Sequence, residues 1–126
     1  MRISPLPWPG DGRGRVLRLP PEALRDFPVA ELHWVTLRPG AVRGNHRHHG
    51  RRELLIVAYD GPWRLAWRGA DGQPRQRDFT GSGAALVVIA PDVLHAIRND
   101  GDGLLQAIAC SDRPPAPGDT EWETLL

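Results

Sequence analysis

Apolar and polar positions along this chain alternate in short runs, and turn-forming residues separate the runs. The runs that read as strands cover residues 16–19, 31–37, 42–48, 53–59, 63–68, 75–79, 85–90, 94–98 and 104–110. Asp71-Gly72 between two of these runs is a strong hairpin signal. We therefore expect about nine or ten strands and almost no helix, which indicates an all-β sandwich or barrel.

One short helix is expected near the N-terminus, over residues 20–27. Proline suits its first turn, Glu22 lies at the positive end of the helix dipole, and Pro28 ends it. The chain, 126 residues long, then reads as a single domain. Its expected parts are an N-terminal arm at 1–14, a barrel core at 31–112 and a C-terminal tail at 113–126.

Composition excludes several classes of function. The net charge of +1 gives no support for nucleic-acid binding. No apolar run approaches the length of a membrane span, and the N-terminus lacks the apolar core of an export signal, so a cytoplasmic protein is expected. Cys110 is the only cysteine, which rules out an intramolecular disulfide and suits a small buried hydrophobe.

Histidine is concentrated in one stretch. Three of the five histidines, His46, His48 and His49, lie within four residues, and Glu53 follows. Alternate residues of a strand share a face, so His46 and His48 point one way and His49 the other. With Glu53 from the next strand and His95 from a more distant one, the set offers three imidazoles and one carboxylate. These donors suit Zn, Ni, Mn, Fe or Co rather than Ca or Mg, and they leave coordination positions for water or a substrate.

The spacing of this stretch resembles the first motif of the cupin superfamily. Glycine, five residues, H-x-H, four residues and glutamate are all present, from Gly40 through His46 and His48 to Glu53. The glycine that normally follows six residues after the glutamate comes here after seven, as Gly61.

A second stretch resembles the other cupin motif less closely. His95 and Asn99 keep their places, whereas Ala90 stands at the usual proline position and Asp92 at the usual glycine position. Glycine there normally supplies permissive backbone angles. Asp tolerates such angles better than most residues, so the departure bears on the loop more than on metal binding.

The cupin resemblance implies a double-stranded β-helix, or jelly-roll barrel, with metal ligands on inward faces near one mouth. The implied ligands are His46, His48, Glu53 and His95, and Asn99 would be a structural turn residue. Cupin barrels also often pair through edge strands, so a homodimer is expected.

A more local resemblance concerns the string from Arg43 to His49. Arg-Gly-Asn-His-x-His-His looks like the cupin domain of capsular-polysaccharide nucleotide-sugar epimerases and, more loosely, like small sugar ketoisomerases. It implies proton abstraction next to a ketone, in polysaccharide biosynthesis. Candidate acid or base residues are Tyr59 and His33, although packing is an alternative role for Tyr59 and a surface or core position is the alternative for His33. Candidate substrate-binding residues are Arg43, Arg47, Arg75 and Arg77.

Three functions stay open at this point. The pattern favours an enzyme, a metal-dependent isomerase or epimerase of a sugar or nucleotide sugar. A metal-dependent iron dioxygenase is the first alternative, because a site with three histidines and one carboxylate also suits iron. A non-catalytic cupin that binds a small ligand is the second. All three take a small molecule as partner and predict neither a nucleic acid nor a membrane.

Overall fold

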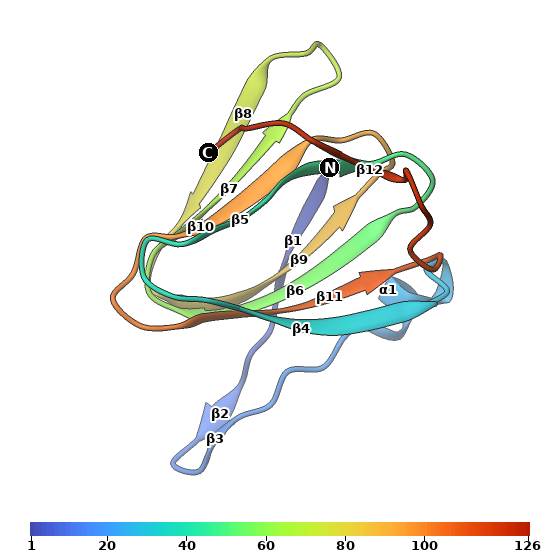
Figure 1. The fold of residues 1–126 in the computed structure, drawn as a ribbon. Coiled ribbons are helices and arrows are strands. Elements are labelled where there is room, and N and C mark those ends of the chain that lie inside the picture. Colours follow the sequence, from blue (N-terminus) through green and yellow to red (C-terminus); the bar gives the residue numbers. More distant parts are fainter.

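A computed structural model describes all residues, 1–126, and shows two five-stranded antiparallel sheets that face each other (Figure 1). The first sheet has the order β1 (Arg2–Leu6), β9 (Ser82–Ile89), β6 (Glu53–Asp60), β11 (Leu105–Ser111), β4 (Glu31–Leu37). The second has the order β12 (Thr120–Trp122), β5 (Val42–His48), β10 (His95–Asn99), β7 (Trp63–Arg68), β8 (Pro74–Phe79). The predicted all-β fold is confirmed.

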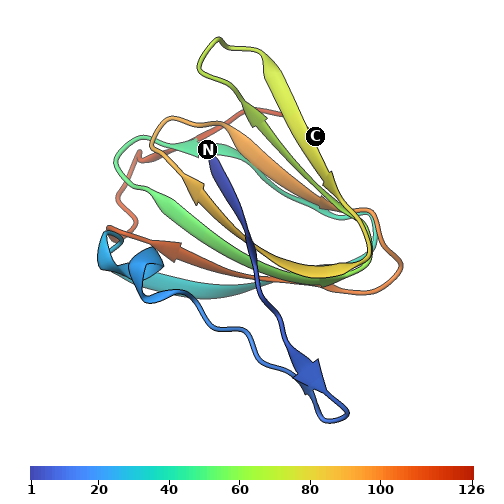
Figure 2. The same cartoon turned by 180° about the vertical axis from the view of Figure 1, so that it is seen from behind.

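Two small elements stand apart from the sheets. A hairpin of β2 (Gly10–Asp11) and β3 (Gly14–Arg15) projects from the barrel, and β1 leads into it along the sheet edge (Figure 2). The single helix, α1 (Pro21–Arg25), begins with proline as predicted but is only five residues long. No helix of the structure is long and apolar enough to cross a membrane.

The main core fills the space between the sheets. Along β6, the side chains of Leu55 and Val57 point inward, where they meet Leu65 of β7. Thirteen buried apolar residues form this cluster. It binds the two sheets together because strand alternation gives each sheet one continuous apolar face.

A second apolar cluster covers the outer face of the first sheet. It contains Leu54, Ile56 and Cys110 together with Phe27 from the segment after α1. Cys110 is buried as its sequence context predicts, and burial raises the pKa of its thiol. On the neighbouring edge strand β4, Leu32 and Trp34 stay exposed. The predicted homodimer stays a prediction.

Both ends of the chain take a larger part in the fold than their sequence indicates. Residues 16–19 do not form the predicted strand, and Leu17 and Leu19 pack against the outer cluster. Instead β1 pairs with β9, and β12 pairs with β5. The sequence predicts neither of these two strands, and both lie outside the predicted core 31–112. Runs of three to five residues carry too little periodicity to be detected.

Asn99 is a structural turn residue, as the second motif implies. Its side-chain amide donates hydrogen bonds to the carbonyls of Leu37, at 3.0 Å, and Gly103, at 2.7 Å. Its side-chain oxygen accepts one from the Gly101 N–H at 2.9 Å. This buried residue ties the β10–β11 turn to the end of β4.

The Trp63→Ala variant is expected to lose about 3–5 kcal/mol of unfolding free energy, as large-to-small changes in cores do. Trp63 is 1% exposed, and its ring stacks on Phe79 with centroids 4.0 Å apart. Urea denaturation followed by circular dichroism measures the change. Trp34→Ala is the matched control, because the Trp34 side chain is exposed and should cost less than about 1 kcal/mol. Equal losses in the two variants would contradict this account of the core.

Candidate functional site

The four predicted ligands meet at one end of the barrel, and they come from both sheets. His46 and His48 lie on β5, and His95 pairs with His46 from the adjacent strand β10. Glu53 begins β6 in the opposite sheet. Ligand atoms of His46, His48 and Glu53 all lie within 4.8 Å of one another. The Nε2 atom of His95 is 2.9 Å from Glu53 Oε2, and that of His48 is 3.4 Å from Glu53 Oε1.

A β-bulge in β5 sets the position of His46. The pairing with β10 shifts register beside His95, and Asn45 takes a positive φ of 57° there. Gly44 has φ 95°, and a Cβ atom on it would lie 2.7 Å from the carbonyl oxygen of His95. Only glycine fits that close approach without strain. As a result Arg43 and His46, three residues apart, line the same pocket.

The side chain of Asn45 anchors the C-terminal segment beside the site. Its oxygen accepts hydrogen bonds from the N–H groups of Leu125 and Leu126 at 2.8 and 3.0 Å. Its amide donates to the Leu126 carbonyl at 3.1 Å. The segment thereby runs along β5, where Thr120 and Trp122 of β12 pair with His48 and His46.

Burial and the neighbouring side chains together set the charge state of the site. Burial and the neighbouring His95 lower the pKa of His46 to about 4, so its imidazole is neutral at pH 7. Burial alone would raise the pKa of the Glu53 carboxyl, but His48 and His95 against it outweigh burial and hold that pKa below its usual range. Glu53 is therefore ionised, with a neutral imidazole of His46 beside it.

The donor group, which consists of His46, His48, Glu53 and His95, suits a divalent transition metal. Donors around an ion with bonds of about 2.0–2.2 Å lie about 3–3.5 Å from one another, and the contacts of Glu53 measure 2.9 and 3.4 Å. One buried nitrogen of the group, Nδ1 of His46, has no hydrogen-bond partner. The Nδ1 of His95 lies 2.9 Å from the Val93 carbonyl oxygen. When Nδ1 carries the proton, it donates a hydrogen bond to that oxygen, and the lone pair of Nε2 is then available to a metal.

A buried ion pair lies directly behind His48, and no sequence motif points to it. The Arg51 Nη2 atom is 3.1 Å from His48 Nδ1, and the Arg51 Nε atom is 3.3 Å from a carboxylate oxygen of Asp119. The hydroxyl oxygen of Thr120 is 3.0 Å from the same ring nitrogen. Asp119 balances the guanidinium charge, so the donor group lies beside a paired cation rather than a free one.

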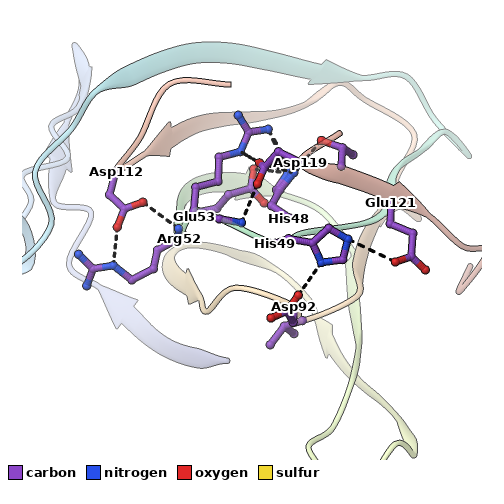
Figure 3. Close-up of polar contacts among 12 residues, drawn as sticks. His48, His49, Arg52, Glu53, Asp92, Asp112, Asp119 and Glu121 are labelled. Carbon is purple, nitrogen blue, oxygen red and sulfur yellow. Dashed lines mark hydrogen bonds and ion pairs between the residues drawn. The ribbon is translucent and has the colours of Figure 1, made fainter. Parts of the chain in front are cut away.

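His49 lies outside the donor group, as strand alternation predicts. Figure 3 shows its ring between two carboxylates: Nδ1 is 2.6 Å from Asp92 and Nε2 is 3.3 Å from Glu121. The hydrogen bond with Asp92 raises the pKa of His49. Asp92 has φ 64°, so it adopts the backbone angles that glycine supplies at this position of the motif. The His49–Asp92 contact ties this loop to the end of β5.

A pocket of about 450 Å³ opens between β4 and β5 and ends at the donor group. Glu53, His46 and His95 line its inner part, and Trp122 contributes to its wall. His33 also lines it, with Nδ1 3.3 Å from a carboxylate oxygen of Glu31. This volume is within the range of small-molecule sites in proteins.

The structure does not bring Tyr59 to this pocket. Tyr59 ends the inward-facing series on β6, six residues beyond Glu53, which is about 20 Å along a strand. Its ring packs edge-on against Trp63 and Phe79 at centroid distances of 5.8 and 5.7 Å. The position suits the packing role that the sequence left open.

The four predicted substrate-binding arginines are dispersed. Arg43 lines the pocket, and its Nε donates to the Thr36 carbonyl at 3.1 Å. Arg47 and Arg75 line a separate hollow of about 510 Å³ beside the β7–β8 turn. Each is paired there, Arg47 with Glu121 and Glu123 and Arg75 with Asp71. Arg77 lies over the Phe79 ring at 5.2 Å.

No protein-family model matches this chain, and no curated protein sequence is significantly similar to it. Solved structures do match. A dTDP sugar isomerase from Desulfovibrio desulfuricans G20 has a TM-score of 0.78 and 20% identity, with 98% of this chain and 83% of that one covered. QdtA, a sugar 3,4-ketoisomerase from Thermoanaerobacterium thermosaccharolyticum in complex with TDP, has a TM-score of 0.72 and 13% identity, with 95% and 85% covered.

The capsular polysaccharide assembling protein CapF from Staphylococcus aureus also matches, with a TM-score of 0.65 and 22% identity. The match covers 95% of this chain but only 33% of CapF. At these identities the likeness concerns the fold. The chain therefore has the cupin-type barrel that it shares with these sugar isomerases and with the matching third of CapF.

Proposed function

We propose that this protein is a metal-dependent isomerase of a nucleotide-linked keto sugar. The observation that carries the proposal is that one pocket is lined by His46, Glu53 and His95 of the donor group and also by His33, a separate histidine beside a carboxylate. The fold neighbours support the substrate class, because QdtA binds TDP and a variant of it binds TDP-4-keto-6-deoxyglucose.

In this proposal His46, His48, Glu53 and His95 hold one divalent transition metal: Zn, Ni, Mn, Fe or Co. Such an ion, when bound, polarises a ketone oxygen and stabilises the enolate charge. The chain itself supplies the geometry. Glu53 is the ionised donor of the group, and the three imidazoles around it leave one side of the group facing the pocket.

His33 is the proposed base, since it is the only histidine of the pocket outside the donor group. It takes the proton from the carbon next to the ketone, and the electron pair of that C–H bond forms the carbon–carbon double bond of an enediolate, whose charge lies on the former ketone oxygen. The proton of the neighbouring hydroxyl passes to that oxygen. As the neighbouring oxygen becomes the new ketone, His33 returns its proton to the former carbonyl carbon. Glu31, 3.3 Å from His33 Nδ1, orients the ring and stabilises the protonated imidazole.

Arg43 is the proposed contact to the diphosphate of the substrate. Its Nε is bonded to a backbone carbonyl, and no carboxylate pairs with its guanidinium. A planar guanidinium with free N–H groups binds phosphate oxygens in a bidentate manner.

The function is tested by incubating metal-loaded protein with TDP-4-keto-6-deoxyglucose in deuterated water. We expect loss of the proton signal at the carbon next to the ketone, followed by signals of an isomeric keto sugar in the proton NMR spectrum. Absence of exchange would contradict the proposal. Oxygen consumption with Fe(II) would then favour a dioxygenase, and tight binding without any reaction would favour a non-catalytic role.

A further inference from the structure

Trp122 is an exposed indole next to the candidate site. It lies on the three-residue strand β12, is 71% exposed and lines the pocket. Its ring centroid is 5.1 Å from that of His46, at an interplanar angle of 68°. Large aromatic side chains in such positions bury much area when a ligand arrives, at little cost in conformational entropy.

The backbone that carries this indole is bonded to β5. β12 pairs with β5, so that Thr120 faces His48 and Trp122 faces His46. The pairing continues past the indole, because the Glu123 N–H donates to the carbonyl of Asn45, also on β5, at 2.9 Å. The fixed backbone places the indole at the pocket before a ligand arrives, which lowers the entropy cost of binding.

The residue after the indole is clamped as well. The Glu123 carboxylate is bonded by two arginines of the second sheet, Arg47 and Arg68. The C-terminal segment is therefore a fixed part of the pocket wall, although its sequence reads as a tail.

We infer that Trp122 is a specificity-determining residue that contacts the sugar ring of the ligand, an inference that rests on the proposed function. The distance to His46 decides which part of a nucleotide sugar lies there. In the proposed reaction the keto sugar lies at the donor group. Because the indole adjoins His46 of that group, the part of the ligand that contacts the indole is the sugar ring. The C–H face of a pyranose ring packs on an indole, while the nucleotide extends further out.

The test is isothermal titration calorimetry of the full chain with two probes, TDP-glucose and TDP. TDP-glucose carries a sugar without the ketone, so it binds without turnover. For Trp122→Ala we expect about tenfold weaker binding of TDP-glucose, the equivalent of about 1.4 kcal/mol, and unchanged binding of TDP. Trp122→Phe, which keeps an aromatic face, should lie near wild type.

Two further variants show whether the loss of affinity comes from the missing aromatic face rather than from unfolding or from lost apolar bulk. Trp122→Leu keeps bulk without an aromatic face and should lose TDP-glucose affinity as Trp122→Ala does. Leu32→Ala removes another exposed apolar side chain, 59% exposed and outside the pocket lining, and should bind both probes as wild type does. Thermal melting of each variant checks the fold.

Equal weakening of TDP and TDP-glucose in the Trp122 variants would assign the indole to the nucleotide and overturn the inference. Unchanged affinity for both probes would overturn it as well. If wild type exchanges the substrate proton but Trp122→Ala binds normally, only the inference fails. If wild type binds neither probe and shows no exchange, the proposed function fails with it.

Discussion

Metal affinity is expected to fall more than about 100-fold when His95 is replaced by alanine. Loss of an outer-sphere partner alone costs about 10–100-fold at metal sites, and removal of a ligand costs more. His95 lies 2.9 Å from the carboxylate of Glu53. Its replacement by alanine removes one of the four metal-donor side chains and leaves a cavity beside the buried Glu53 carboxylate. His46→Ala should have a similar effect. Zinc affinity is measured by competition with a chromophoric chelator, and bound metal by elemental analysis.

His49→Ala is the matched control for this experiment. His49 adjoins a ligand in the sequence, but its ring contacts Asp92 and Glu121 instead of the donor group (Figure 3). We therefore expect this variant to keep its metal. Circular dichroism confirms that each variant is folded. A folded His95→Ala protein with unchanged metal content would remove the site as proposed.

The strands of the barrel were predictable because most of them carry a clear two-residue period or a continuous apolar run. Strand β6 is an example: the apolar run predicts it at 53–59, and the strand is observed at Glu53–Asp60. The pairings that the sequence does not encode in this way are those of β1 and β12. β1 pairs with β9 and β12 with β5, and each of these strands is too short to show a period in the sequence.

Part of the donor group was predictable from the local sequence, whereas another part depends on strands that are far apart in the chain. Strand alternation places His46 and His48 on one face and excludes His49, and all of this is local. That His95 joins them depends on the pairing of β10 with β5. The sequence does not predict this pairing, and only the resemblance to the cupin motifs implied His95 as a ligand. The register shift at Asn45 was not predictable from alternation, because a bulge breaks the two-residue rule that the prediction uses.

Other parts of the site depend on contacts between distant segments. Arg51 and Asp119 are 68 residues apart in the sequence, and their pairing behind His48 follows only from the fold. The same holds for Trp122, whose segment has the proline-rich composition of a tail. Tyr59 illustrates the opposite case: its chemistry made it a candidate acid, but six residues of strand carry it away from the pocket.

His33→Gln is expected to slow deuterium exchange of the sugar substrate by about 10²- to 10⁴-fold, the usual contribution of a general base. His33 faces the pocket from β4, whereas the donor group lies on β5, β6 and β10. Its replacement should therefore leave the metal content and the affinity for TDP unchanged. Exchange is measured by proton NMR in deuterated water, with metal-loaded protein and TDP-4-keto-6-deoxyglucose.

Two companion variants show whether the effect belongs to the base. Glu31→Gln removes the carboxylate 3.3 Å from His33 Nδ1, so it should reduce exchange less than His33→Gln does. Tyr59→Phe removes a hydroxyl that lies outside the pocket, and its exchange rate should match wild type. If His33→Gln exchanged at the wild-type rate while Tyr59→Phe did not, the base would have to be sought at the Tyr59 end of the barrel. The pocket between β4 and β5 would then not be the place where the proton moves.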